Sequence, residues 1–221
     1  MPPDRSFFFR NRQDAGRALG AALLPLAASH PLVLALPRGG VPVAFEVARA
    51  LDADMDLLFV RKIGSPDHEE YGLGAVVDGA DPQIVLDEAY IRASGIGADT
   101  IQRIVDRQCA EIDRQRHLYA PGRHPVPVTG RVVIVVDDGI ATGGTMRAAL
   151  RALRKNHPAR LVLAVPVAPA QSIAALGAEC DRIVCLLQPR SFLAVGACYQ
   201  DFPQVDDAEV MRLVAQARAP H

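Results

Sequence analysis

The sequence predicts an α/β protein in which helices sandwich a parallel sheet. Apolar runs alternate with helical segments along most of the chain, as in β-α-β units with right-handed crossovers. In the central runs polar residues do not alternate with apolar ones, which indicates strands buried on both faces. The expected strands are 32–36, 54–60, 131–136, 160–165 and 182–187, and the main helices that join them are 41–51, 146–156 and 169–176.

The composition fits a single domain, residues 1–221, with a sizeable core. Half of the 221 residues are hydrophobic and 22% are charged. The formal net charge of −1 argues against a nucleic-acid partner held by bulk electrostatics. No run approaches the ~18 apolar residues of a membrane span, so no membrane partner is expected. The four cysteines lack C-x-x-C spacing and no secretory signal is evident, so we expect reduced thiols and a cytoplasmic location.

The N-terminal part is expected to hold a helix, a strand and a basic glycine turn. Residues 1–10 are rich in proline and aromatic residues and suggest a loose arm or an edge that packs on a second subunit. Helix 11–28 follows, and Pro25 weakens its last turn. Strand 32–36 then ends in Pro37-Arg38-Gly39-Gly40, directly before the next helix. Such a turn suits an anion, although an ordinary turn with a surface arginine has the same composition.

The middle of the chain interrupts this alternation. Residues 61–72, which begin with Arg61 and Lys62, contain Gly and Pro and are expected to form a polar loop after strand 54–60. The two cations either bind an anion or are simply solvated at the strand end. Two strands and two helical segments are predicted next, at 73–77, 83–86, 87–93 and 97–119.

Helix 97–119 is the clearest amphipathic segment, and it belongs to a helical insertion at about 88–120. Asp99 and Gln102 suggest a capping pair at its start. The helix could pack on the core or on a second subunit, and we favour the core.

Residues 131–145 are the most informative stretch. Five Val and Ile residues predict a buried strand, and Asp137 and Asp138 follow where that strand ends. Ligands of open α/β sheets bind beyond the carboxyl ends of strands. Glycines and two threonines then open a helix, whose N-terminal N–H groups favour an anion. The carboxylates suit sugar hydroxyls or a cation, and the turn 142–145 suits a phosphate. The spacing excludes the G-x-G-x-x-G and G-x-x-x-x-G-K-[ST] motifs.

The tail after residue 187 is rich in aromatic residues, in a chain that is only 5% aromatic. A final helix is predicted at 207–217, with Asp206 and Glu209 as a capping box.

The stretch VVIVVDDGIATGGT resembles the 5-phosphoribosyl-1-pyrophosphate (PRPP) motif of type I phosphoribosyltransferases. The resemblance implies a Rossmann-like parallel-sheet core at about 11–187, followed by a small hood and C-terminal helix at about 188–217. In that family the acids hold the ribose 2′- and 3′-hydroxyls and the loop holds the 5′-phosphate. The resemblance therefore implies that PRPP is bound by Asp137, Asp138, Gly139, Ala141, Thr142, Gly143, Gly144 and Thr145.

Three other segments resemble the family less specifically. Pro37-Arg38-Gly39-Gly40 looks like its pyrophosphate loop, in which a cis peptide commonly precedes the glycines; here that bond would join Pro37 and Arg38. The place of Arg61 and Lys62 is similar to that in adenine-type enzymes, where the following loop closes over the pyrophosphate. The tail resembles the hood of purine enzymes, which implies base-binding roles for Phe192, Val195 and Tyr199; simple aromatic packing over the sheet edge is the alternative.

The resemblance implies transfer of the phosphoribosyl group from PRPP to a small acceptor with release of pyrophosphate, in a Mg²⁺-dependent homodimer. It assigns catalysis to Arg38, Arg61, Lys62 and Asp138, and it makes Asp137 and Asp138 the metal site, largely through PRPP and water. Ala141 stands where 6-oxopurine enzymes carry an Asp, so the base is not specified. A PRPP or nucleotide sensor without turnover, or an enzyme using phosphate or water as acceptor, are the alternatives.

Overall fold

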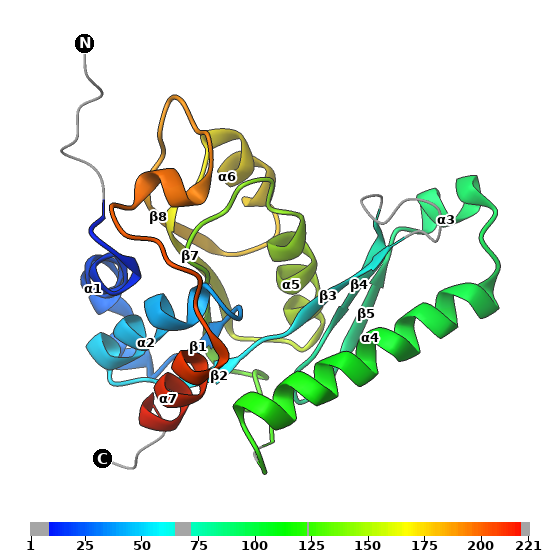
Figure 1. Cartoon of the computed structure of the whole chain (residues 1–221), viewed down its shortest axis with the longest axis horizontal. Helices are drawn as coiled ribbons and strands as arrows, with labels where there is room; N and C mark the ends of the chain where they lie inside the picture. Colours follow the sequence, from blue (N-terminus) through cyan, green and yellow to red (C-terminus); the bar gives the residue numbers. More distant parts are fainter. Residues whose placement is uncertain (1–8, 65–71, 123, 218–221) are drawn as a thin grey trace.

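The computed structural model describes residues 9–64, 72–122 and 124–217 (Figure 1). Its main sheet has five strands in the order β2-β1-β6-β7-β8, and every pairing is parallel. The strands are β1 (Leu32–Ala35), β2 (Asp54–Leu57), β6 (Val132–Val136), β7 (Arg160–Val167) and β8 (Arg182–Leu187). The expected parallel α/β fold is therefore confirmed.

Helices cover both faces of this sheet (Figure 1). On β6, Ile134 and Val136 pack on one side with α1 (Arg12–Leu23), α2 (Gly40–Leu51) and α7 (Asp207–Ala217). Val133 and Val135 pack on the other side with α5 (Gly144–Lys155) and α6 (Ala170–Leu176). Because successive side chains point to opposite faces, both sets must be apolar, which explains the unbroken Val/Ile run.

The expected helix 11–28 is α-helical only as far as Leu23. Leu24–Ser29 continue it as a 3-10 helix, η2, with Pro25 in its first turn. Proline has no N–H to donate to the preceding turn, so the regular hydrogen-bond ladder cannot continue through it.

A second, antiparallel sheet lies beside α5 and consists of β3 (Val60–Gly64), β4 (Gly72–Val77) and β5 (Gln83–Leu86) (Figure 1). The prediction of one strand over 54–60 is wrong, because the chain changes sheets in the middle. Leu58 N–H still donates to Ala35 O of the main sheet, at 2.9 Å, but Phe59 O accepts from Asp78 N–H at 3.0 Å. Arg61 and Lys62 therefore lie within β3 and not in a loop after a strand.

The insertion packs on this second sheet and contributes to the core, as we favoured, whereas the second sheet itself was not predicted. It contains α3 (Glu88–Ser94) and α4 (Ala98–Tyr119), and α4 buries Ile101, Val105 and Ile112 in the same core as Ile63. The expected capping pair is wrong: Gly97 is the N-cap, and Gln102 Nε2 donates to Asp106 Oδ1 at 2.8 Å. None of the described helices combines the length and apolar character needed to cross a membrane.

The hood, residues 188–206, runs over the edge of the main sheet before α7 begins (Figure 1). It contains the 3-10 helix η3 (Val195–Cys198), and Phe9, which precedes α1, pairs with it. Phe9 forms a parallel bridge with Tyr199, and its carbonyl accepts from Gln200 N–H at 2.8 Å. The expected cap of α7 is present, since Glu209 N–H donates to Asp206 Oδ1 at 2.7 Å.

Candidate functional site

Two loops that are distant in the sequence, 37–40 and 137–145, meet at the carboxyl ends of β1 and β6. The Pro37–Arg38 peptide bond that precedes the first glycine pair is cis, as expected. A Cβ on Gly39 would overlap the Asp138 carboxylate, and a Cβ on Gly40 would lie 2.8 Å from Val136 O. Only glycine lets the first loop lie this close to the acid pair, so the structure brings together two segments that the sequence linked only by resemblance.

The acid pair is held in a largely buried setting. Asp137 Oδ1 accepts the backbone N–H of Asp138 at 2.8 Å. Burial, and after it the charge of Asp138, raise the pKa of Asp137 well above its ordinary range. Burial also raises the pKa of Asp138, although Arg12 opposes the effect. Such a pair gains most from a ligand that brings hydrogen-bond donors or positive charge.

The turn after the acids leaves the N-terminus of α5 open. Gly143 adopts a left-handed φ of 81°, and among the described residues no side chain caps this helix. By contrast, Asn11 caps α1 and Asp206 caps α7 with their side chains. Uncapped N–H groups at a helix start are an anion site when the surrounding loop is fixed. Here Ser172 Oγ fixes it by donating to Ala141 O at 2.5 Å.

Asp138 has two partners outside these loops. Arg12 Nε donates to Asp138 Oδ2 at 2.7 Å, and the Tyr199 hydroxyl donates to the Asp138 carbonyl at 2.5 Å. Burial first, and then the charge of Asp138, raise the pKa of Tyr199, so the hydroxyl remains a donor. Arg12 was not predicted from the sequence, because one arginine at the start of a helix carries no local signal of a partner 126 residues away.

Two of the predicted catalytic cations are paired with acids elsewhere. Arg38 Nη1 lies 3.4 Å from Asp207 Oδ1, at the start of α7, and the Tyr119 hydroxyl donates to the same oxygen at 2.7 Å. Burial and Asp207 together raise the pKa of Tyr119 to about 12. Arg61 Nη2 lies 2.9 Å from Glu111 Oε1 of α4. Both arginines would have to leave these partners to reach a leaving group.

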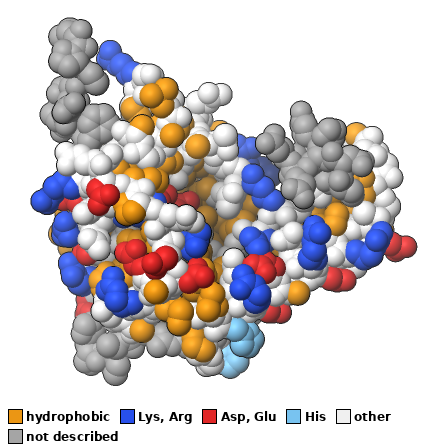
Figure 2. Space-filling view, viewed as in Figure 1, with side chains coloured by type: hydrophobic (Ala, Val, Ile, Leu, Met, Phe, Trp, Pro, Cys, Tyr) orange, Lys and Arg blue, Asp and Glu red, His pale blue; other side chains and the backbone are white. Residues whose placement is uncertain are grey.

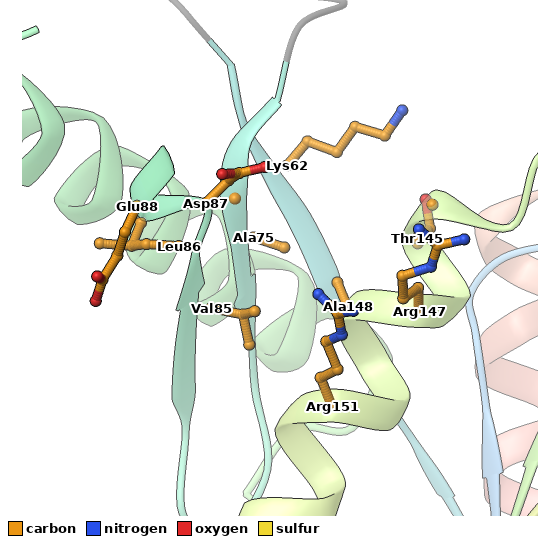
Figure 3. A pocket seen from close by; sticks show the side chains of 12 residues that line it. Lys62, Ala75, Val85, Leu86, Asp87, Glu88, Thr145, Arg147, Ala148 and Arg151 are labelled. Atoms are coloured by element: carbon orange, nitrogen blue, oxygen red, sulfur yellow. The ribbon is translucent and has the colours of Figure 1, made fainter. Parts of the chain in front are cut away.

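Lys62 points to the other side of β3, because neighbouring strand residues face opposite ways. It borders a hollow of about 570 Å³ between the second sheet and α5 (Figure 3). Thr145 of the open helix start borders the same hollow, and Arg147 and Arg151 line its α5 side. Ala75 and Val85 form its floor on the sheet. Of the two cations in β3, Lys62 is therefore the one that lies on the side of the turn 142–145, which is predicted to bind a phosphate.

Small residues contribute to both walls of the hollow. Gly74 and Ala75 lie on the sheet, and Gly144 and Ala148 lie opposite on α5. The loop expected to close as a lid spans residues 61–72, but residues 65–71 lie outside the described part of the chain.

The predicted base-binding residues belong to one apolar cluster in the hood. Val195 packs so closely on the acid loop that a Cβ on Gly139 would lie 2.5 Å from Val195 Cγ1. Phe192 is half-buried against the same cluster. Tyr199 is only 7% exposed, and its ring packs against Phe9 and Phe202 with centroids 5.6 and 4.8 Å away. Tyr199 therefore supports Asp138, and Phe192 and Val195 are better placed to contact a ligand.

Positive charge is distributed rather than concentrated on the face in view. Along α4, Arg side chains alternate with Asp and Glu (Figure 2). Glu111, for example, pairs with Arg61 and with Arg114, at 2.9 and 2.8 Å.

A magnesium ion could be accommodated only with help from a ligand. Among the described residues no three His, Cys, Asp or Glu side chains gather as a metal cluster. The acid pair supplies two carboxylates, and Mg²⁺ is commonly bound by one or two carboxylates together with substrate phosphates and water. The donor set therefore fits Mg²⁺ carried in with a phosphorylated ligand.

Comparisons with known proteins converge on one family. A model described as a phosphoribosyl transferase domain matches residues 13–200. Rv0571c of Mycobacterium tuberculosis H37Rv and MT0597 of strain CDC 1551, both provisionally named phosphoribosyl transferases, are each 41% identical over 209 residues. That alignment covers 95% of this chain and 47% of either relative, so the chain spans about half of their length. The crystal structure of TT1426 from Thermus thermophilus superposes with a TM-score of 0.84 at 40% identity, covering 96% of this chain and all of that one.

Proposed function

Because this chain belongs to the phosphoribosyl transferase family, we propose that it transfers the 5-phosphoribosyl group from PRPP to a nitrogenous base or related nucleophile and releases pyrophosphate. The observation that carries the proposal is the contact between the two loops. Gly39 and Gly40 lie against the acid pair, so a sugar held by Asp137 and Asp138 would have its leaving group beside the 37–40 loop.

The sugar half of the site has the chemistry that the donor requires. The open start of α5 offers backbone N–H groups to the 5′-phosphate. The Asp137 and Asp138 carboxylates accept hydrogen bonds from the ribose hydroxyls. They also repel phosphate, which keeps the phosphate on the turn and the diol on the acids.

The leaving group needs positive charge. Backbone N–H groups of the 37–40 loop and the side chain of Lys62 are the groups that would supply it. Arg38 would join them after it leaves Asp207, and Arg61 after it leaves Glu111. When bound with PRPP, Mg²⁺ would neutralise part of the pyrophosphate charge. Burial raises the pKa values of both carboxyls of the acid pair, and a cation at this place would favour their charged forms.

Catalysis would consist mainly of positioning and charge stabilisation. Departure of pyrophosphate leaves positive charge on the sugar, and the carboxylates below it stabilise that charge. Exclusion of water prevents hydrolysis of this reactive state, which is the purpose of a closing lid.

The acceptor would lie between the acid loop and the hood. Val195 packs on Gly139, and Phe192 belongs to the same cluster. The end of β7, Val165–Pro166–Val167–Ala168, is uncharged, so an acceptor would be recognised by apolar contact and backbone groups more than by a charged side chain.

The direct test is pyrophosphate release from PRPP with Mg²⁺, measured across purines, pyrimidines and phosphate, with Asp138→Asn as control. We expect release that depends on one acceptor class and falls at least a hundredfold in the variant. Release that depends on phosphate or water, but on no base, would replace the acceptor assignment with that of a sugar-phosphate enzyme.

A sensor of PRPP or nucleotides without turnover is the second candidate. The pairing of Arg38 with Asp207 and of Arg61 with Glu111 favours it, because two of the three leaving-group cations are engaged elsewhere. Calorimetric binding of PRPP without release for any acceptor would establish this function.

A further inference from the structure

Arg12 lies where the hood meets the acid pair, and no motif of the site includes it. It is the first residue of α1 and only 9% exposed. Its Nε donates to Asp138 Oδ2 at 2.7 Å, and its Nη1 donates to Pro203 O at 2.6 Å. Its guanidinium carbon lies 3.6 Å from the centroid of the Phe202 ring. One side chain thus contacts the second acid, the hood backbone and a hood aromatic ring.

These contacts are directional. A guanidinium is planar and presents its donors in a fixed fork, so one oriented by Pro203 and Phe202 can hold a carboxylate in one rotamer. Because the pair is buried, loss of one partner would leave an uncompensated charge, which is costly. Lysine could keep the charge but could not contact both Asp138 and Pro203 with a fixed geometry.

A residue of the hood also fixes the backbone of Asp138. The Tyr199 hydroxyl donates to the Asp138 carbonyl, and the Tyr199 ring packs against Phe202. Gly196 fits under that ring, because a Cβ there would lie 2.8 Å from Phe202 Cδ1. The carboxylate and the carbonyl of one acid are therefore both fixed by residues that also shape the hood.

We propose that Arg12 is a positioning residue that orients the Asp138 carboxylate for the donor sugar and couples that acid to the hood. Arg12 takes one carboxylate oxygen, Oδ2, and thereby directs the other. A change at Phe202 or Pro203 of the hood would shift Arg12 and, through it, the orientation of the Asp138 carboxylate. The hood therefore influences donor affinity without contacting the donor. For the identity of the donor, this inference rests on the proposed function.

The test is calorimetric binding of PRPP with Mg²⁺ to the wild type and to Arg12→Met, Arg12→Lys and Phe202→Leu. We expect Arg12→Met to weaken binding at least tenfold and Arg12→Lys to restore part of it. Phe202→Leu keeps the charge and removes the ring beneath it, so it should weaken binding about threefold. Arg10→Met is the matched control: the exposed side chain of Arg10 pairs with Asp14 near the same helix start, and this variant should bind as the wild type does.

Unchanged donor affinity in Arg12→Met would overturn the proposal. If Arg12→Met does not fold, Arg12→Lys and Phe202→Leu decide in the same way, since wild-type affinity in both contradicts the coupling.

A second measurement separates this inference from the proposed function. If the wild type does not bind PRPP, the proposed function fails, and the link between Arg12 and Asp138 is then judged by urea unfolding without ligand. We expect Arg12→Met to lower stability less in an Asp138→Asn background than in the wild type, because the carboxylate is no longer left unpaired. Equal losses in both backgrounds would show that Arg12 does not act through Asp138.

Discussion

Gly39 lies against the carboxylate of Asp138, although 98 positions of sequence separate them. A Cβ at position 39 would overlap Oδ2 and lie 2.7 Å from Cγ of Asp138. The same Oδ2 accepts the hydrogen bond from Arg12. The first glycine loop and the second acid therefore cannot be altered independently, because any side chain added to the loop displaces the acid.

Gly39→Ala should impair the site more than the fold. The new methyl group has to push the Asp138 carboxylate away from Arg12, and overpacking of this kind costs about 1–3 kcal/mol. We expect donor affinity to fall at least tenfold in calorimetry. Gly97→Ala is the control, because Gly97 has a negative φ of −68° and no atom within 4 Å of an added Cβ. Equal donor affinity in the two variants would contradict the close contact.

The geometry of the acid loop could be predicted from sequence because it is local. A buried strand, two acids and a glycine turn follow one another within 131–145, and each part has its own physical signature. The cis bond at Pro37–Arg38 was found in the same way, from a short segment that resembles a known loop.

Features that depend on distant partners could not be predicted. Arg12 acts on Asp138 through a contact that only the folded chain creates. The break after Leu57 depends on Asp78, whose carboxylate accepts Phe59 N–H at 2.7 Å and thereby holds the chain in the second sheet. Residues 57–60 are all apolar, so no local pattern marks where the pairing partner changes.

The stability of the protein should fall as pH rises from about 4 to 6, in part because of Asp78. Burial raises the pKa of this carboxyl from 3.8 to about 6, although Arg116 opposes the effect. In this window the folded state binds the proton more tightly than the unfolded chain, so raising the pH removes stabilisation of at most about 3 kcal/mol. Urea unfolding at several pH values would measure the slope, and Asp78→Asn should flatten it. The same slope in both proteins would rule out Asp78 as its source.

Arg116→Met should destabilise the protein strongly. Arg116 pairs with Asp78 at 2.5 Å, donates to Leu57 O at 3.1 Å, and so ties α4 to the point where the chain changes sheets. Removing one member of a buried pair typically costs about 3–5 kcal/mol. Arg114→Met is the control, since exposed Arg114 pairs with Glu111 and an exposed ion pair contributes little to stability. Similar urea midpoints for both variants would refute this role of Arg116.

Phe192→Ala should weaken acceptor binding and leave donor binding intact. Phe192 is half-buried in the hood cluster near Val195, whereas the donor groups lie on the acid loop and the start of α5. Loss of a stacking face costs about 1–3 kcal/mol per base, so the acceptor KM should rise roughly five- to a hundredfold. Leu193→Ala is the neighbouring control, because that side chain is 87% exposed. A parallel loss of PRPP affinity would show that Phe192 shapes the sugar site and not the acceptor site.

Lys62 and Arg61 should differ in function even though they are neighbours. They lie in β3 and face opposite sides of the second sheet: Lys62 borders the hollow beside Thr145, and Arg61 pairs with Glu111 of α4. We expect Lys62→Met to weaken binding of pyrophosphate and PRPP about tenfold with no change in Tm, because an exposed lysine contributes little to the fold. Arg61→Met should lower pyrophosphate affinity less, and only to the extent that Arg61 leaves Glu111 when a ligand binds. Glu111→Gln separates these effects, because it releases Arg61 without removing it. Tighter pyrophosphate binding in this variant would mean that the ion pair with Glu111 restrains Arg61. Unchanged binding would mean that, of the two β3 cations, only Lys62 contacts pyrophosphate.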